Sequence, residues 1–361
     1  MRRAAGFVLA ASAALAAAQP GEEPRAPDGR RYRSQPLVAS LYTADPAAHV
    51  FDGKLYVFAS HDIEGLPLPD LPPFRGAQGN AFKMRDYVVL EMDRPGGAVR
   101  IHRDVLDIKD VPWAARQMWA PDVARHRGAY HLYFPAKDRA GAFRIGVATS
   151  RSPTGPFKAR PRPMEGSYSI DPAVFTDDDG RSYMYFGGLS GGQLQKVVDG
   201  VYDPNGPATD PRRPGDRAFM PQVARLSDDM LEFAERPRDA LIVDGAGEPL
   251  LSGDEKRRFF EGAWMHKHYG RYYLSYSTGG SHFIAYAVGD SPYGPFTYRG
   301  AILKPVQGWT THASTVAFGG RWWLFYADSQ LSGKTWLRNV KVTEFHHQPD
   351  GSIRTIDPFM P

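Results

Sequence analysis

The sequence predicts an all-β protein folded as a five-bladed β-propeller. Three observations lead to this prediction: one pattern recurs five times, two of its copies are followed by near-identical third-strand segments, and apolar stretches of helical period are almost absent. The chain has 361 residues, 42% of them hydrophobic, which is enough to bury a large core in one such domain.

The recurring pattern is a polar residue, an apolar stretch, a glycine turn and an aromatic-rich strand, which together predict a β-hairpin. Its five copies are Asp45–Ser60, Asp122–Lys137, Asp171–Gly188, Glu261–Ser277 and His312–Ser329. Successive copies start 77, 49, 90 and 51 residues apart, so insertions of unequal length separate them. Repeated sheets with loops of variable length fit a propeller, and a β-sandwich is the alternative that the pattern leaves open.

The N-terminus precedes the first copy and has the layout of a secretory signal. Residues 1–18 contain two arginines and then an alanine-rich apolar run that ends in small residues. This run is shorter than the roughly 20 residues of a membrane helix, and no other stretch approaches that length, so no membrane span is expected. We therefore expect a secreted or periplasmic protein with a signal peptide at 1–18, a flexible segment at 19–36 and the propeller domain at 37–361.

Segments after the hairpins are expected to complete the blades. Ile145–Phe157 and Ile284–Phe296 each predict a third strand that ends at a Ser-Pro and Gly-Pro bend. The longest insertions, His61–Arg85 and Leu189–Met220, predict loops at the rim of the ring. After the fifth hairpin, residues 336–356 predict two more strands that complete the last blade.

Composition excludes several classes of function. The chain has no cysteine, which rules out disulfides, thiolate metal sites and cysteine nucleophiles. The formal net charge is +4, two units of which come from the signal arginines, and the other basic residues are scattered. Nucleic acid is therefore not an expected partner.

In a propeller the innermost strands line the axis, so equivalent positions of the five repeats converge. Those positions hold Asp45, Asp122, Asp171, Glu261 and His312. Neighbouring buried carboxyls raise one another's pKa, and such clusters mark functional sites. Hydrolysis of a glycosidic bond requires one ionised and one protonated carboxyl group, which this cluster can supply.

Five motifs in combination give the chain a resemblance to a known family. They are Ala44–Pro46, Met118–Asp122, Ser169–Pro172 followed by Asp177–Gly180, Phe260–Gly262, and Thr311–Ser314. From Ala44 to its C-terminus the chain resembles glycoside hydrolase family 43, whose members are five-bladed propellers with an inverting mechanism. The resemblance implies that Asp45 is the general base, that Glu261 is the general acid, and that Asp171 orients the acid and keeps its pKa raised. It implies no catalytic role for Asp122, for which we expect a structural one.

Further residues are candidates for binding. Sugar rings pack their C–H faces on aromatic side chains, and Trp119, just before the second inner strand, is the best candidate for such a wall. By the resemblance, His61, Asp62 and Arg338 are candidates for substrate contacts. His312 matches a histidine that helps relatives hold calcium or water on the axis. We therefore expect no required cofactor, with a structural calcium ion possible at this position.

The expected activity is that of an exo-acting, inverting hydrolase that removes terminal β-D-xylose or α-L-arabinofuranose from plant cell-wall oligosaccharides. The long insertions favour exo action because they could close the pocket around one sugar. An endo-arabinanase and a sugar-binding propeller without catalysis are alternatives. A retaining invertase-type enzyme is disfavoured, because its Asn-Asp-Pro and Arg-Asp-Pro signatures are replaced by Ala44-Asp-Pro and Arg85-Asp-Tyr.

Overall fold

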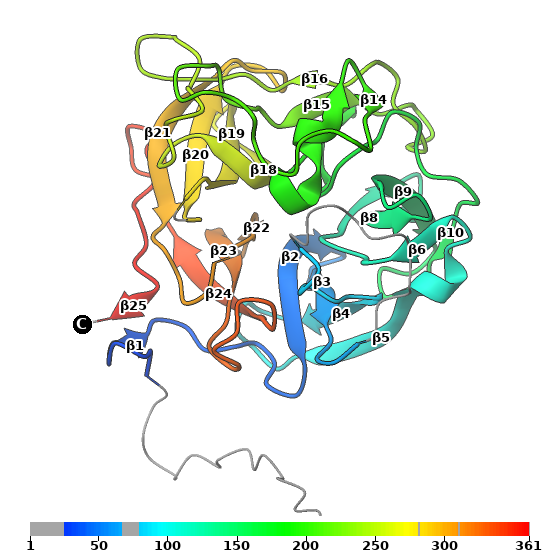
Figure 1. Cartoon of the computed structure of the whole chain (residues 1–361). Coiled ribbons are helices and arrows are strands. Elements are labelled where there is room, and N and C mark those ends of the chain that lie inside the picture. The colour runs from blue at the N-terminus through cyan, green and yellow to red at the C-terminus, as the bar shows by residue number, and fades with distance from the viewer. Residues whose placement is uncertain (1–24, 67–78, 281, 310, 361) are drawn as a thin grey trace, which may run out of the picture.

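The five predicted hairpins form the inner halves of five antiparallel sheets arranged in a ring. A computed structural model describes residues 25–66, 79–280, 282–309 and 311–360, so the predicted signal peptide lies outside the described residues. In Figure 1 the sheets follow one another around a common centre in chain order. The chain is therefore an all-β, five-bladed propeller, as predicted.

Each blade starts at its innermost strand. Blade 1 consists of β2 (Tyr42–Phe51), β3 (Lys54–Asp62), β4 (Asp86–Met92) and β5 (Arg100–Asp107). Blade 2 consists of β7 (Asp122–His126), β8 (Ala129–Asp138), β9 (Phe143–Ser150) and β10 (Lys158–Ala159), and β6 (Ala114–Arg116) also pairs with β8. Blade 3 consists of β11 (Ala173–Thr176), β12 (Ser182–Phe186), β15 (Gln222–Arg225) and β16 (Arg238–Asp239).

The last two blades differ at their outer edges. Blade 4 consists of β18 (Phe259–His268), β19 (Arg271–Thr278), β20 (Ile284–Gly289) and β21 (Phe296–Leu303), with β17 (Ile242–Val243) parallel to β21. Blade 5 has three strands in the described chain, β22 (Ala313–Phe318), β23 (Arg321–Asp328) and β24 (Asn339–Phe345). The inner strands β2, β7, β11, β18 and β22 pack against one another in that order, and β22 packs against β2.

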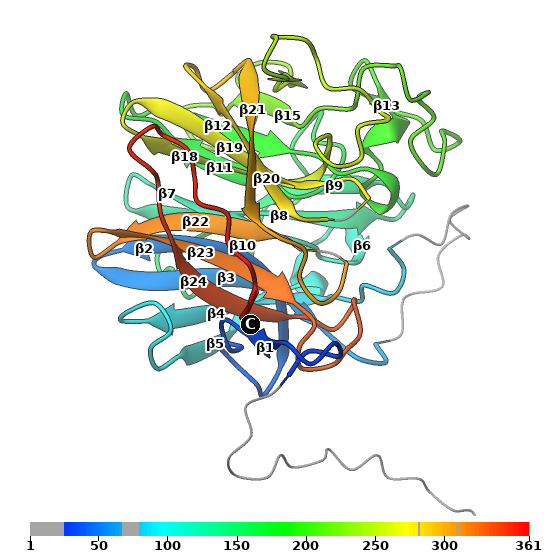
Figure 2. The same cartoon turned by 90° about the vertical axis from the view of Figure 1, so that its left-hand side faces the viewer.

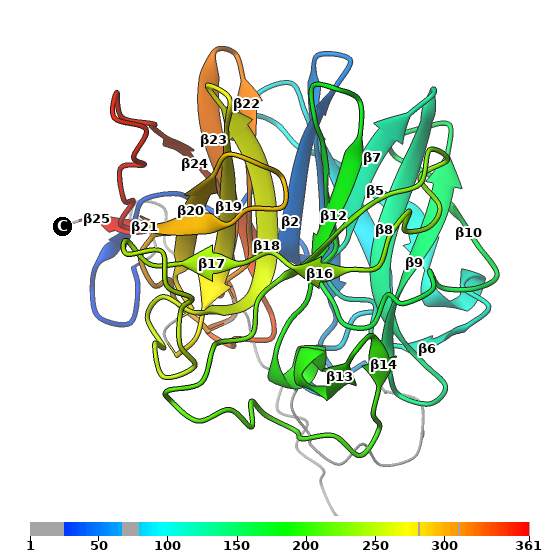
Figure 3. The same ribbon diagram turned by 90° about the horizontal axis from the view of Figure 1, so that it is seen from above.

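Short elements lie outside the blades. They are β1 (Arg31–Tyr32), β13 (Val197–Val198), β14 (Val201–Tyr202), β25 (Phe359–Met360) and the 3₁₀ turns η1 (Ile108–Asp110), η2 (Ser190–Gly192) and η3 (Leu194–Lys196). Figure 3 shows β13 and β14 beyond one end of the blades. The predicted rim loop Leu189–Met220 thus contains η2, η3 and this small hairpin. No helix among the described residues is long and apolar enough to cross a membrane.

The core lies between blades, because alternate residues of a strand face opposite sides of its sheet. In β8, Leu132 and Phe134 pack with Phe58 of blade 1. Between them, Tyr133 points to the other face and packs with Met184 of blade 3. Three further seams close a ring of five blades, and the remaining large clusters fill them between blades 3 and 4, 4 and 5, and 5 and 1. Two-sided burial explains why the inner halves of the blades are so rich in aromatic and β-branched residues.

The ring closes differently from the prediction. After β24, His347 pairs with Ile353 only in an isolated bridge, and Ile356 then lies parallel to Leu303 of β21. Residues 346–356 therefore do not complete blade 5, because Ile353 and Ile356 are buried in the seam between blades 4 and 5. The N-terminal segment lies beside β24 instead: the N–H of Leu37 donates to Val340 O at 2.8 Å.

Part of the segment expected to be flexible is ordered. Residues Arg31–Tyr32 form β1, which pairs antiparallel with β25, and Tyr32 is buried against Phe359. Figure 2 shows β1 beside the C-terminal end of the chain. The expectation of flexibility for 19–36 is thus wrong for residues 25–36, because an aromatic contact and backbone pairing hold them to the propeller.

Candidate active site

Three of the five predicted strand starts have an unusual backbone. Asp45 and Asp171 have left-handed φ angles of 52° and 58°, and Gly262, directly after Glu261, has a φ of 68°. The strand register shifts at the first and third of these sites, between Ala44 and Ala47 in β2 and around Glu261 in β18. Such bulges re-aim a side chain, and left-handed residues other than glycine cost about 1–3 kcal/mol. Neither Asp122 nor His312 has a positive φ, so the backbone separates three of these positions from the other two.

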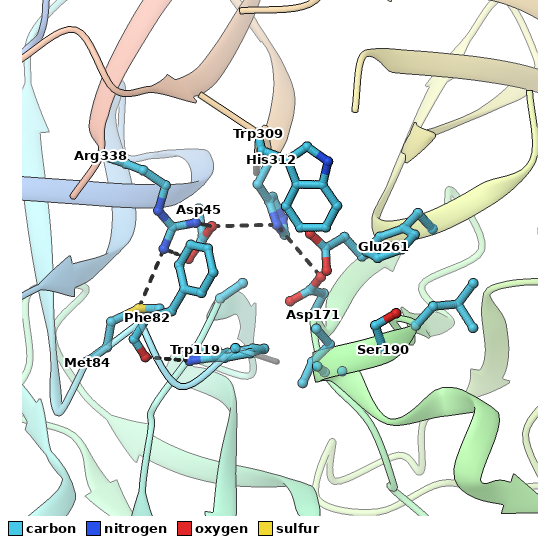
Figure 4. Close-up of a pocket in the computed structure, with 17 residues that line it drawn as sticks. Asp45, Phe82, Met84, Trp119, Asp171, Ser190, Glu261, Trp309, His312 and Arg338 are labelled. Atoms are coloured by element: carbon cyan, nitrogen blue, oxygen red, sulfur yellow. Dashed lines mark hydrogen bonds and ion pairs between the residues drawn. The ribbon is translucent and has the colours of Figure 1, made fainter. Parts of the chain in front are cut away.

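These three carboxyl groups open into one cavity of about 350 Å³ on the propeller axis. Figure 4 shows Asp45 and Arg338 on one side, Asp171 and Glu261 on the other, and His312 between them. The lining is completed by aromatic, apolar and glycine residues: Gly79, Phe82, Met84, Trp119, Ala120, Ile170, Leu189, Ser190, Gly191, Gly192, Phe260 and Trp309. The arrangement is a small pocket with apolar walls and a few convergent charged groups, as is typical of a ligand site.

Asp45 is held by a buried arginine. Arg338, directly before β24, places Nη1 2.6 Å from Asp45 Oδ1 and Nη2 3.2 Å from Oδ2. Ser60 Oγ donates to Asp45 Oδ2 at 2.8 Å. The other edge of the same guanidinium donates to Asp62, with Nε 2.9 Å from Oδ2 and Nη2 2.9 Å from Oδ1. Burial alone would lower the pKa of Arg338, but Asp45 and Asp62 together raise it, so the guanidinium stays charged.

Glu261 and Asp171 have no such cation directly beside them among the described residues. Burial, and then the neighbouring charge of Asp45, raises the pKa of Glu261 to about 8. Burial also raises the pKa of Asp171 well above its usual range, and the charges of Glu261 and Asp45 add to this effect. The N–H of Gly262 donates to Asp171 Oδ2 at 3.0 Å and partly opposes the shift. Both groups therefore retain protons at a pH where an exposed carboxyl group is ionised.

His312 lies between the two sides, with Nδ1 4.0 Å from Asp45 Oδ1 and 3.9 Å from Asp171 Oδ2. Burial lowers its pKa, which favours the neutral ring. Calcium takes six to eight oxygen ligands, whereas His312 offers one nitrogen to an ion on the axis. The part of the chain that the structure describes contains no group of three His, Asp or Glu side chains placed to hold a metal. The donor set does not fit a calcium site made of protein atoms.

Asp122 points away from this cavity. Its Oδ1 lies 2.6 Å from His49 Nε2 in blade 1, and its Oδ2 accepts from the N–H of Val174 in blade 3 at 2.5 Å. The carboxylate thus ties three blades together near the axis, which supports the structural role expected for it.

The candidate binding residues divide into two groups. Trp119 and Arg338 line the cavity. His61 and Asp62 do not: His61 Nδ1 faces Asp86 Oδ1 at 3.0 Å, and the Asp62 side chain is fully buried behind Arg338. Alternation along β3 turns His61 to the opposite face from Ser60, whereas Asp62 lies on the same face as Ser60 and is covered by Arg338. The cavity is thus lined by two of the four candidate binding residues, and contact of His61 and Asp62 with substrate stays a prediction.

Several lining residues escaped the sequence analysis. Phe82 and Met84 come from the insertion His61–Arg85, Ser190 to Gly192 from the other long insertion, and Trp309 from the loop before His312. A tryptophan two residues before the Thr311–Ser314 motif was a usable signal for Trp309. At Gly79 a Cβ atom would lie 2.5 Å from the Trp119 ring, and φ is 82°, so this position requires glycine.

Comparisons with known proteins identify the family of this chain. The family model described as glycosyl hydrolases family 43 matches residues 100–353. The chain is 54% identical over 332 residues to xylosidase/arabinosidase 43A of Humicola insolens, covering 90% of this chain and 99% of that protein. It is 52% identical over 329 residues to a xylosidase/arabinosidase of Bacteroides ovatus, covering 89% and 97%.

Solved structures give the same result. The chain is 56% identical, with a TM-score of 0.87, to CoXyl43, a β-xylosidase/α-arabinofuranosidase from a compost metagenome solved with xylotriose in a calcium-free form; 92% of this chain and 100% of that one are covered. The GH43_1 enzyme of Xanthomonas citri with bound xylose is 52% identical with a TM-score of 0.84, over 91% and 94% of the chains. This chain belongs to glycoside hydrolase family 43 and is a glycoside hydrolase.

Proposed function

We propose that the protein is a secreted, inverting exo-glycosidase that releases terminal β-D-xylose or α-L-arabinofuranose from xylan- or arabinan-type oligosaccharides of the plant cell wall. One observation carries the proposal. Asp45 is paired with a guanidinium, whereas Glu261, in the same cavity, has a pKa raised to about 8. The raised pKa of Glu261 suits it to be the acid, and the different environment of Asp45 suits that group to be the base.

Asp45 acts as the general base in this mechanism. Arg338 and Ser60 both donate hydrogen bonds to this carboxylate and fix its orientation. The carboxylate takes a proton from a water molecule as the water oxygen attacks the anomeric carbon. Because the water enters opposite the leaving group, the product has the inverted configuration.

Glu261 acts as the general acid and Asp171 positions it. Glu261 gives its proton to the glycosidic oxygen as the bond to the anomeric carbon breaks. Asp171 accepts from the N–H of Gly262, the residue after Glu261, and so fixes the backbone that carries the acid. Its negative charge, when present, also opposes ionisation of Glu261.

The walls favour a single sugar at the end of a chain. A volume of about 350 Å³ is near the lower limit for small-molecule sites. Trp119 offers an aromatic face, and its Nε1 donates to Phe82 O at 3.2 Å, which holds the ring upright against the Phe82 segment. The names of relatives support a pentose: two are called xylosidase/arabinosidase, and one solved structure contains xylose. Calcium held at His312 through water stays a prediction, as does secretion.

The test has two parts. Nitrophenyl glycosides of xylose and arabinofuranose identify the sugar. Activity on xylobiose or arabinobiose, whose leaving alcohol requires an acid, is then followed from pH 4 to 10 and should fall above about pH 8 because Glu261 must be protonated. Proton NMR should detect the inverted anomer first. A retained anomer as the first product would refute the roles given to Asp45 and Glu261, and rapid loss of arabinan viscosity would favour endo action.

Replacement of the acid gives the sharpest result. Glu261→Gln should lower kcat/KM on unactivated oligosaccharides by about 10²–10⁴-fold, because general acid catalysis contributes that much. The exposed Glu165 provides a control, and Glu165→Gln should leave kcat/KM unchanged. Full activity of Glu261→Gln on oligosaccharides would contradict the assignment.

A further inference from the structure

His282 lies directly behind the general acid, in the loop between β19 and β20. Its side chain is fully buried, and its Nδ1 lies 3.9 Å from Glu261 Oε1. The imidazole packs between two residues of the cavity wall, with ring centroids 3.9 Å from Trp309 and 4.7 Å from Phe260. His312, by contrast, faces the other two carboxylates. His282 is thus a second histidine of the site, on the side of the acid.

His282 destabilises the folded state. Neither ring nitrogen has a hydrogen-bond partner in the described structure, and a buried unsatisfied polar group costs about 1–3 kcal/mol. Its φ of 47° is left-handed, which adds a similar cost for a residue other than glycine. A side chain that served packing alone would be more stable as an apolar ring. Two unfavourable features in one residue beside a catalytic carboxyl group indicate a function.

The ring is neutral under all working conditions. Burial, and then the positive charge of Arg258, lowers the pKa of His282 to about 3. A neutral imidazole has one N–H donor and one lone pair, so it neither adds a charge to the cavity nor competes as an acid. The separation of 3.9 Å is too long for a hydrogen bond. Catalytic hydrogen bonds are often this long in free enzymes and shorten when substrate binds, and a shift of about 1 Å closes this one.

We propose that His282 is a positioning residue for Glu261: its Nδ1–H donates to Oε1 once substrate fills the cavity. The protonated oxygen Oε2 is then held toward the glycosidic oxygen. As Glu261 gives its proton away and the bond to the leaving group breaks, the carboxyl group becomes a carboxylate, and the hydrogen bond to Oε1 strengthens. His282 keeps its own proton throughout. An interaction that is stronger in the transition state than in the ground state accelerates the reaction.

The inference rests on the proposed function, since it requires Glu261 to be the acid. It predicts a dependence on the leaving group. A 4-nitrophenolate leaves without protonation, whereas the alcohol released from xylobiose or arabinobiose requires an acid. A defect in acid positioning therefore slows the disaccharide and spares the nitrophenyl glycoside.

The test compares three substitutions of His282. His282→Phe keeps the ring and removes both nitrogens; it should lower kcat on the disaccharide about 10–100-fold and kcat on the nitrophenyl glycoside less than about 3-fold. His282→Asn tolerates the left-handed backbone and places an amide N–H near the position of Nδ1, so it should recover disaccharide kcat to within about 5-fold of wild type. If His282→Phe does not fold, His282→Gly takes its place, because glycine accepts the φ angle without strain. It should show the same large loss on the disaccharide and the same small loss on the nitrophenyl glycoside.

A pH profile separates positioning from structure. Loss of a donor to the ionised carboxylate raises the pKa of Glu261 in the substrate complex, so the basic limb of kcat should move to higher pH in His282→Phe. His131, a buried histidine of β8 away from the cavity, is the matched control, and His131→Phe should change neither the leaving-group dependence nor the limb.

The outcomes distinguish the two hypotheses. If Glu261→Gln shows no dependence on the leaving group, the proposed function fails. If Glu261→Gln shows it, but His282→Phe and His282→Gly lose equal activity on both substrates or none at all, the role of His282 is refuted. Recovery by asparagine together with the shifted basic limb supports it.

Discussion

At the scale of the residue, one carboxylate of the site, Asp45, has an ion pair with an arginine, whereas Asp171 and Glu261 have none in the described part of the chain. Arg338 satisfies Asp45 and Asp62 together, so its planar guanidinium binds two carboxylates along different edges. Asp171 receives one backbone N–H and the repulsion of its neighbours. Stability and activity therefore make opposite demands on Asp171.

Asp171→Asn should abolish most of the activity and raise the melting temperature. The pKa of Asp171 is raised in the folded protein, so the folded state binds a proton that the unfolded chain releases. Its contribution to stability is present at low pH and is lost as the pH rises above the unfolded value of 3.8 toward the folded one. Calorimetry from pH 5 to 8.5 should show that the melting temperature of the variant depends less on pH than that of the wild type. A variant that melts below the wild type at pH 8 would contradict this account.

The meeting of the carboxyl groups of the inner strands could be predicted, because the repeat places them at equivalent positions of their hairpins. Asp45, Asp171 and Glu261 stand at equivalent places of three hairpins, and the structure brings them to one cavity. The pairing of Asp62 with Arg338 joins residues 276 positions apart and has no local signal. Phe82 and Trp309 come from loops whose course depends on tertiary contacts. The strained φ of His282 has no counterpart in the residue pattern either.

At the scale of the element, β18 carries two kinds of chemistry at its two ends. Glu261 lies near its start, and His266 and His268 lie near its end, against His347 after β24. His266 Nε2 is 3.2 Å from His347 Nε2, and its Nδ1 is 3.0 Å from Thr315 Oγ1 of β22. Trp322 and Tyr273 cover the group. Three histidines therefore hold the seam between blades 4 and 5.

This seam should weaken in acid. Burial lowers the pKa of His266 well below 6.5, and burial together with His268 lowers that of His347 to about 4. Groups with a depressed folded pKa stabilise the protein above their unfolded pKa, and this contribution is lost as the pH falls from about 6.5 to about 4. His347→Phe should have a lower melting temperature than wild type at pH 7. Its melting temperature should also fall less than that of wild type when the pH is lowered to 4.5. His346→Phe, at an exposed neighbour, should keep the full acid sensitivity.

Elements inside the repeats were predictable, and those that close the ring were not. All five hairpins and the third strands β9 and β20 form where the glycine turns and Ser-Pro bends indicated. The stretch after β24 has strand-type composition, but its isoleucines fill a seam rather than a sheet edge. Local composition does not specify which neighbour such a segment pairs with.

At the scale of the whole molecule, stability depends on closing the ring between blades 1 and 5. Thr43 and Leu37 donate backbone hydrogen bonds to Arg338 O and Val340 O, and Val38 and Leu41 are buried with Phe325 of blade 5. The same few residues lead directly into Asp45 on one strand and Arg338 on the other. The contacts that close the ring therefore also bring Asp45 and Arg338 together.

Truncation should reveal this coupling. A chain that starts at residue 37 loses β1 and should melt a few degrees lower with kcat unchanged. A chain that starts at residue 42 also loses Val38 and Leu41, and burial of two such side chains is worth about 3–6 kcal/mol. It should melt far lower, with a loss of kcat at temperatures where the blades remain folded by circular dichroism. Equal melting temperatures for the two truncations would show that closure contributes little.

The charges around the cavity also favour the binding of cations. Arg338 carries one positive charge between the Asp45 and Asp62 carboxylates, Glu261 can give up its proton when a cation binds, and low-dielectric walls focus the resulting field. A sugar mimic with a protonated ring nitrogen should bind more tightly than its neutral ether counterpart, as isothermal titration calorimetry can measure. A uronic acid at the end of the chain should be rejected for the same reason. Inhibitor design for this enzyme thus begins with a basic amine at the anomeric centre.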